Sequence, residues 1–115
     1  MKNIRELQAI VDSLGEWVSI MGLLASCPRP YNQADKYMIV LADKKIDRAL
    51  KLLKQEVYSG AKMAGDYQQT ALRRRDPIMN QDAIKSCIIL NGIVNQTNAH
   101  IVNFNAYLCL CENHI

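Results

Sequence analysis

The chain has 115 residues, of which half are hydrophobic and 22% are charged, and its formal net charge is +3. That length is typical of one domain, and it suffices to bury a core without metal or disulfide staples. The small positive excess does not by itself indicate a nucleic-acid partner. No apolar run approaches the roughly 18 residues that a bilayer-spanning helix needs, so we expect no membrane partner.

Near the N-terminus, an apolar stretch ends in Leu24-Ala25-Ser26-Cys27, which has the form of a lipoprotein cleavage box. Glu6, Asp12 and Glu16 precede it, where a signal peptide requires a basic start without acidic residues. The spacing of the cysteines does not resemble a secreted disulfide framework. They are Cys27, Cys87, Cys109 and Cys111. We therefore expect a cytoplasmic protein with buried, reduced thiols.

The first helix is predicted at residues 2–25, because apolar residues recur there at spacings of three and four. These residues are Ile4, Leu7, Val11, Leu14, Val18, Met21 and Ala25. One position behind them is a run of small residues, Gly15, Ser19, Gly22 and Ser26. Small side chains lower helix propensity but allow close approach, so we expect tight packing against another helix.

A loop is predicted at residues 26–33. Pro28 and Pro30 disfavour helix at their own positions and at the residues before them. Asn32 is placed to cap the helix that follows.

The second helix is predicted at residues 34–63. Its inner face has spacings of three and four, typical of an amphipathic helix. The residues of this face are Ile39, Ala42, Ile46, Ala49, Leu53, Val57 and Gly60. Gly60 and Gly65 weaken the continuation, so residues 66–75 either form a separate short helix or prolong the second one.

Asp76-Pro77 is the clearest boundary, because aspartate caps helices and proline suits the first helical position. A third helix is predicted at residues 77–113, with a seam of alternating four and three spacings. The seam contains Ala83, Cys87, Leu90, Val94, Thr97, Ile101, Phe104, Leu108, Cys111 and Ile115. This helix either breaks at Gly92, which gives a compact bundle, or stays whole and overhangs. The seam crosses Gly92 in register, which favours the unbroken helix.

Beside the seam lies a stripe of asparagines that also contains Ile84, Ile88 and Val102. Half-buried asparagines at a helical seam specify register and partner number at some cost in stability. We therefore expect a homo-oligomer, most simply a dimer, with the third helix at its interface. The predicted interface residues are Asn91, Asn95, Asn98, Ile101, Phe104, Asn105 and Leu108. A ligand-binding face is a second interpretation, because amides donate to and accept from bases and peptide groups, and a solvated face is a third.

Basic residues gather in the middle of the chain, where positions 44–75 hold nine basic and three acidic residues. A basic helical stripe with a tyrosine suits an acidic protein surface or a phosphate backbone. A solvated helix face has the same composition. The predicted binding residues are Lys44, Lys45, Arg48, Lys51, Lys54, Tyr58, Lys62, Arg73, Arg74 and Arg75.

The C-terminal segment CLCENH offers two thiols and His114, but structural zinc usually takes a C-x₂-C pair with a second pair elsewhere. Side chains two positions apart on a helix point away from each other, so we expect no metal site. His100 and His114 have no nearby nucleophile motif, and there is no glycine-rich phosphate loop. We expect neither catalysis nor a cofactor.

Together these patterns predict one all-α domain, an elongated bundle of three long helices or of four or five shorter ones. The chain reads as a small non-enzymatic adaptor, regulator or inhibitor that docks on an acidic protein surface. Such short, motif-free, mildly basic chains suit a phage or a bacterial accessory locus. A nucleic-acid- or nucleotide-binding helical module is the alternative.

Overall fold

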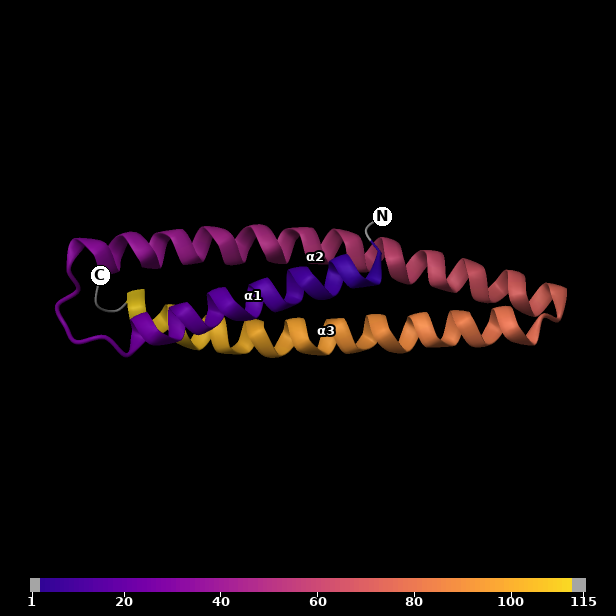
Figure 1. Ribbon diagram of the computed structural model, residues 1–115. Coiled ribbons are helices and arrows are strands. Elements are labelled where there is room, and N and C mark those ends of the chain that lie inside the picture. Colours follow the sequence, from indigo (N-terminus) through magenta and orange to yellow (C-terminus); the bar gives the residue numbers. More distant parts are fainter. Residues whose placement is uncertain (1–2, 113–115) are drawn as a thin grey trace.

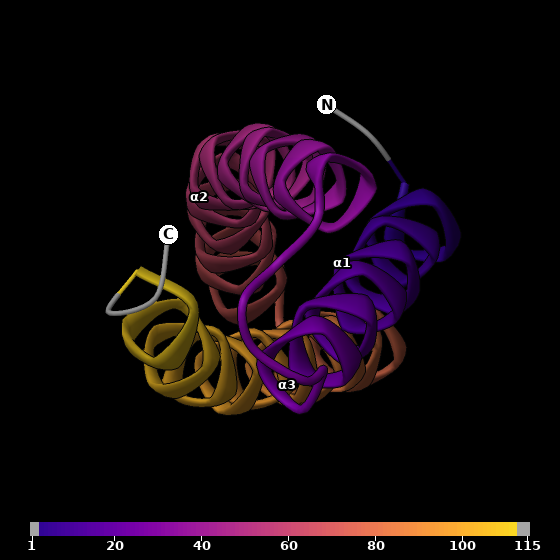
Figure 2. The same ribbon diagram turned by 90° about the vertical axis from the view of Figure 1, so that its left-hand side faces the viewer.

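The computed structural model describes residues 3–112, which form three helices: α1 (Ile4–Ala25), α2 (Gln33–Arg74) and α3 (Pro77–Glu112). Successive helices run in opposite directions and form a rod of 64 × 19 × 18 Å (Figure 1). Seen along the rod, the three helices sit at the corners of a triangle (Figure 2). The all-α class and the elongated shape are confirmed, and the described residues contain no strand.

The N-terminus of helix α1 is capped by a side chain that accepts a hydrogen bond from a backbone N–H group of its first turn. The Asn3 side chain accepts a hydrogen bond from the backbone N–H of Glu6 at 2.8 Å. At the other end, the backbone N–H of Ser26 donates to the Gly22 carbonyl at 3.2 Å. Proline residues follow, so the chain leaves the helix there and crosses to α2.

Helix α2 is continuous from residue 33 to residue 74, so the segment 66–75 prolongs the second helix. A capping box starts it, in which Asn32 accepts from the backbone of Asp35 and the Asp35 carboxylate accepts from the backbone of Asn32. Gly60 lies on the buried side of the helix, where small size permits close packing. The helix ends as Arg75 adopts a left-handed conformation with φ of 51°.

Helix α3 starts directly after that turn. One carboxylate oxygen of Asp76 accepts from the backbone N–H groups of Ile78 and Met79, both at 3.1 Å, and Pro77 occupies the first helical position. The helix then runs unbroken through Gly92 to Glu112. Its 36 residues correspond to about 54 Å. The third helix therefore stays whole, which is the alternative favoured by the seam.

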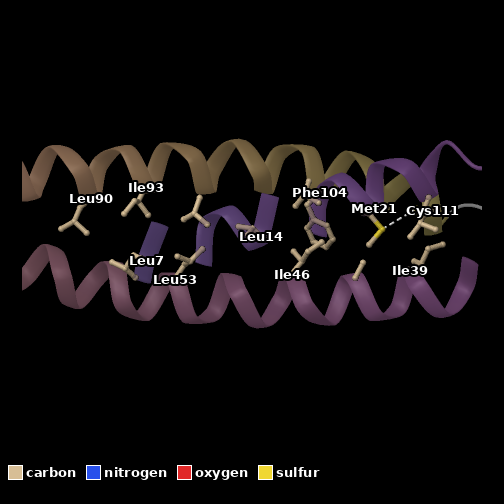
Figure 3. Close-up of a cluster of buried hydrophobic side chains, with 14 of the residues drawn as sticks. Leu7, Leu14, Met21, Ile39, Ile46, Leu53, Leu90, Ile93, Phe104 and Cys111 are labelled. Atoms are coloured by element: carbon tan, nitrogen blue, oxygen red, sulfur yellow. Dashed lines mark hydrogen bonds between the residues drawn. The ribbon is translucent and has the colours of Figure 1, made fainter. Parts of the chain in front are cut away.

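The hydrophobic core lies along the axis on which the three helices meet (Figure 3). Every third or fourth residue of α1 contributes to it, and α2 and α3 complete it. The largest fully buried side chains are Leu7, Val11, Leu14, Met21, Ile46, Leu53, Ile93 and Cys111. Within the described residues, no polar or charged residue is buried.

Helix α1 covers only part of the hairpin formed by α2 and α3 (Figure 1). Its first turns, at Ile4 and Leu7, line one groove with Gly60 and Leu90. Beyond that level the hairpin continues with two helices only. Ser86 and Ala83 of α3 line that same groove, whereas Cys87 is exposed, so the expectation that Cys87 belongs to the core seam is wrong. The inner side of α3 passes here through Ala83, Leu90 and Ile93, and Cys87, one residue after Ser86, points about 100° away from Ser86.

Candidate interaction surfaces

The basic residues of α2 occupy its solvent side. We call the set Lys44, Lys45, Arg48, Lys51, Lys54, Tyr58 and Lys62 the basic stripe; all seven side chains are exposed. The stripe extends about 27 Å along the helix. The Tyr58 ring is 75% exposed in its middle, which is unusual for an aromatic side chain without a partner.

Charge within the basic stripe is weakly compensated. Lys51 Nζ lies 3.0 Å from Asp47 Oδ2, and the two side chains are 78% and 62% exposed. Such an exposed pair one turn apart contributes only about 0.3–0.5 kcal/mol. Lys51 therefore remains free to exchange this partner for another anion.

Residues of the basic stripe border a groove on each side of α2. Lys45 and Arg48 border a groove of about 330 Å³ toward α1, whose floor includes Trp17. Lys54 borders a groove of about 340 Å³ toward α3, where Asn98 forms part of the opposite wall. Each groove offers a partner an apolar floor beside a cationic edge.

The three arginines at residues 73–75 lie apart from the basic stripe, at the tip of the hairpin. Arg73 donates to the Thr70 hydroxyl at 3.4 Å, and Arg75 forms the turn. Arg73 follows Lys62 by eleven positions, which corresponds to about 16 Å along the helix. The structure therefore divides the predicted basic site into a helix face and a separate arginine tip.

The predicted oligomer interface is also divided. Asn91, Asn95 and Asn105 are exposed on the outer side of α3, and Asn98 is exposed at the edge of the groove toward α2. Ile101, Phe104 and Leu108 point toward the other two helices. Phe104 is 9% exposed and belongs to the core, so little of its side chain remains for a second chain.

Exposed aliphatic side chains accompany the asparagines. Ile84, Ile88 and Val102 are 42%, 65% and 68% exposed. Residues 86–111 contain no aspartate, glutamate, lysine or arginine at all. This segment is the longest in the sequence without a charged residue, and its exposed side chains form the outer face of α3.

Small residues of α1 accommodate rings of α3. A Cβ added to Gly15 would lie 2.9 Å from Cε1 of His100, and one added to Gly22 would lie 2.9 Å from Cε2 of Tyr107. The side chains of Gln8 and Gln96 also join the two helices by a 2.9 Å hydrogen bond. The tight packing predicted for this run occurs at both glycines, and His100 is engaged in it.

The C-terminal thiols are far from alike. Cys111 is buried, 3.8 Å from the Met21 sulfur and 3.9 Å from the Tyr31 hydroxyl, while Cys109 is exposed. Burial raises the pKa of the Cys111 thiol, which keeps it protonated and poorly nucleophilic. Residues 3–112 hold no group of three potential metal ligands, and His114 lies outside the described residues.

Among residues 3–112, one helix is long and apolar enough, by length and composition, to cross a bilayer, and it is α1. This corrects the expectation that no segment of the chain reaches that length. A core helix of a water-exposed bundle can have the same length and apolar composition. Leu7, Leu14 and Met21 of α1 are fully buried against the other helices, and 33% of the apolar stretch of α1 is buried.

No protein-family model, no curated protein and no solved structure matches the chain. What the protein can bind follows here from its own residues. Two surfaces stand out among those described: the basic stripe of α2 and the uncharged outer face of α3.

Proposed function

We propose that the chain is a small non-enzymatic protein that acts by docking the basic stripe of α2 on an acidic protein surface. The observation that carries this proposal is the exposure of six cationic side chains along about 27 Å of one rigid helix. The exposed Tyr58 ring among them supplies the aromatic anchor that protein interfaces favour. In such a role the protein would serve as an adaptor, a regulator or an inhibitor.

The reactive side chains of the described residues support a binding role. His100 packs against Gly15 of α1, and the thiol of Cys111 is buried beside Met21. Neither group faces a cleft in which a substrate could meet a second catalytic residue. Apart from the Tyr58 phenol, the functional groups of the basic stripe are ammonium and guanidinium groups, which bind anions rather than react with them.

Nucleic acid is the alternative ligand for the same cations. A straight row of lysine and arginine side chains can follow the phosphates of a nucleic-acid backbone. Asp47 within the row and the apolar grooves on both sides fit a protein surface better, because a phosphate backbone offers nothing for an apolar floor to bury.

The functional unit in this proposal is a homo-oligomer, most simply a dimer, with α3 at its interface. Two copies joined there would present two basic stripes to one partner or to two. Such bivalency raises apparent affinity without new contacts, provided that both sites can be reached at once.

The experiment that tests the docking proposal compares the wild type with Arg48→Glu/Lys51→Glu and with Arg5→Glu/Lys85→Glu. Both double variants change the net charge equally at exposed helical positions, but the second pair lies outside the basic stripe. Each protein is used to capture partners, and each is titrated with a fluorescent 20-base-pair DNA at two salt concentrations.

We expect a partner that the wild type and the control variant retain and that the Arg48→Glu/Lys51→Glu variant binds at least about tenfold more weakly. Loss of DNA binding, with a smaller salt dependence, would favour the nucleic-acid alternative. Equal binding by all three proteins would refute a role for the stripe.

A further inference from the structure

The outer face of α3 lacks the charges that keep a solvated helix face apart from other molecules. Ile88, Asn95 and Val102 lie on it at intervals of seven residues, and the charge-free segment continues on both sides. Amides donate and accept at once, so a face of amides and aliphatic groups complements an identical face. Elsewhere the chain carries an excess of positive charge, which would repel a second copy.

The residues of this face are arranged nearly symmetrically about Asn95. Ile88 precedes Asn95 by seven positions and Val102 follows it by seven. Ile84 precedes it by eleven and Ala106 follows it by eleven. In a twofold contact residue i meets residue j and j meets i, so an antiparallel pair centred on Asn95 places aliphatic groups against aliphatic groups.

The same pairing places amides against amides. Asn91 and Asn98 lie within one helical turn on either side of Asn95, at the centre of the face. In the antiparallel arrangement Asn91 of each copy lies close to Asn98 of the other, near the twofold axis. A central polar contact flanked by apolar contacts fixes the register of a helix pair.

Repulsion between the arginine tips of two copies favours antiparallel over parallel pairing of their α3 helices. In a parallel pair the two tips, each with Arg73, Arg74 and Arg75, would lie side by side and repel. In the antiparallel pair each tip is about 27 Å from the axis, so the tips are about 54 Å apart. That separation is far beyond the Debye length of about 8 Å in physiological salt.

We propose that two copies of the chain pair antiparallel through the outer face of α3, with the twofold axis at Asn95. This inference rests on the homo-oligomer of the proposed function and specifies its geometry. Ile88 of each copy contacts Val102 of the other, and Ile84 contacts Ala106. The contact is built from residues that the intramolecular core leaves exposed, so it adds to the bundle without rearranging it.

The size of this face sets the expected strength of the dimer. From Ile84 to Ala106 it is about 33 Å long and about one helix diameter, 10 Å, wide. It therefore buries roughly 330 Å² per chain, less than half of the roughly 800 Å² of a standard interface. We expect a dimer that dissociates on dilution.

The first test is light scattering on a sizing column over a series from about 10 μM to about 1 mM protein. The wild type should approach twice the 13.0 kDa of one chain at the upper end. Val102→Lys should remain monomeric throughout, because it places a charge inside the face. Leu23→Lys is the matched control, since Leu23 is 71% exposed on α1 and Val102 is 68% exposed.

Far-ultraviolet circular dichroism on each variant separates loss of the dimer from loss of the fold. A wild type that is monomeric at the highest concentration overturns the proposal. So does a Val102→Lys variant that is folded and dimerises as well as Leu23→Lys.

The second test establishes direction by disulfide trapping in a background in which the exposed Cys87 and Cys109 are changed to serine. An Ile88→Cys chain mixed with a Val102→Cys chain should form a cross-linked heterodimer, whereas neither variant alone should cross-link. Cross-linking of each single variant with itself would indicate a parallel pair and overturn the antiparallel geometry while leaving the oligomer intact. Binding through the basic stripe is read separately, from the Arg48→Glu/Lys51→Glu variant.

Discussion

At the scale of single residues, two glycines of α1 are important because they have no side chain. Gly15 and Gly22 leave room on α1 for the rings of His100 and Tyr107. The composition of α1 predicted that a neighbour would come close, since small residues recur along one side. It did not predict that rings, rather than backbone, fill the space, because the facing residues are about 85 positions away in the sequence.

Filling one of these spaces should destabilise the bundle. Gly22→Leu would drive a side chain into Tyr107, and overpacking of this kind costs about 1–3 kcal/mol of unfolding free energy. Urea denaturation measures the change. Gly65→Leu is the matched control, because a Cβ at Gly65 meets nothing within 4 Å. Equal effects at the two glycines would contradict the close packing of Tyr107.

A second residue-scale prediction concerns alkaline pH. Burial raises the pKa of Tyr31 and of Cys111 above their ordinary values of 10.0 and 9.0. The unfolded chain then releases these protons at lower pH than the folded chain does. The free energy of unfolding should therefore fall as pH rises above about 9.

Tyr31→Phe tests this pH dependence. The variant loses the 2.9 Å hydrogen bond to the Leu24 carbonyl, which costs about 1 kcal/mol at neutral pH, but its alkaline decline should be shallower. Urea denaturation at pH 7 and pH 10 measures both effects. Tyr58→Phe, at an exposed position, should retain the decline of the wild type. A Tyr31→Phe decline as steep as that of the wild type would show that Tyr31 does not contribute.

At the scale of elements, local signals define where each helix begins. Asn3, Asn32 and Asp76 each accept hydrogen bonds from the first turn of their helix. Two of these caps, Asn32 and Asp76, are recognisable in the sequence because they accompany the proline segments. The continuity of α2 was left open, because glycine lowers helix propensity whether or not packing compensates for it. In the structure, Gly60 is buried within the bundle, and tertiary packing outweighs the propensity.

The cap at the hairpin turn can be tested directly. Asp76→Ala should lower the free energy of unfolding by about 1 kcal/mol, since it removes the acceptor for two backbone N–H groups. Asp76→Asn keeps a side-chain oxygen and should retain most of the stability. Thermal denaturation of the two variants provides the comparison. If alanine and asparagine are equivalent, the cap does not contribute.

At the scale of the whole molecule, the unequal helix lengths create two regions: one in which three helices pack together and one in which only α2 and α3 do. Helix α1 has 22 residues and α2 has 42, so α1 accompanies only about half of the hairpin. The supported half contains most of the fully buried side chains, from Leu53 and Leu7 to Cys111. The overhanging half exposes Leu72 and Ile78 instead.

Hydrogen exchange should report this difference. Regions with few buried contacts open more readily, so amides of residues 62–72 should exchange at least about tenfold faster than amides of residues 46–56. Both segments lie on α2, which controls for helix type, and a dilute sample keeps the chain monomeric. Uniform exchange along α2 would contradict the division into two regions.

The sequence by itself determined the helical class, the boundaries at residues 26–33 and at Asp76-Pro77, and most of the inward positions, because periodicity and caps are local properties. It also contained the basic stripe and the charge-free segment of residues 86–111. Only the tertiary structure decided which apolar residues of α3 face inward. Ile93 is buried and Cys87 is exposed, since burial depends on which side of α3 the other two helices cover. The position of a neighbouring helix is not a property of the residues it covers, and for that reason the division between core and free surface had to come from the fold.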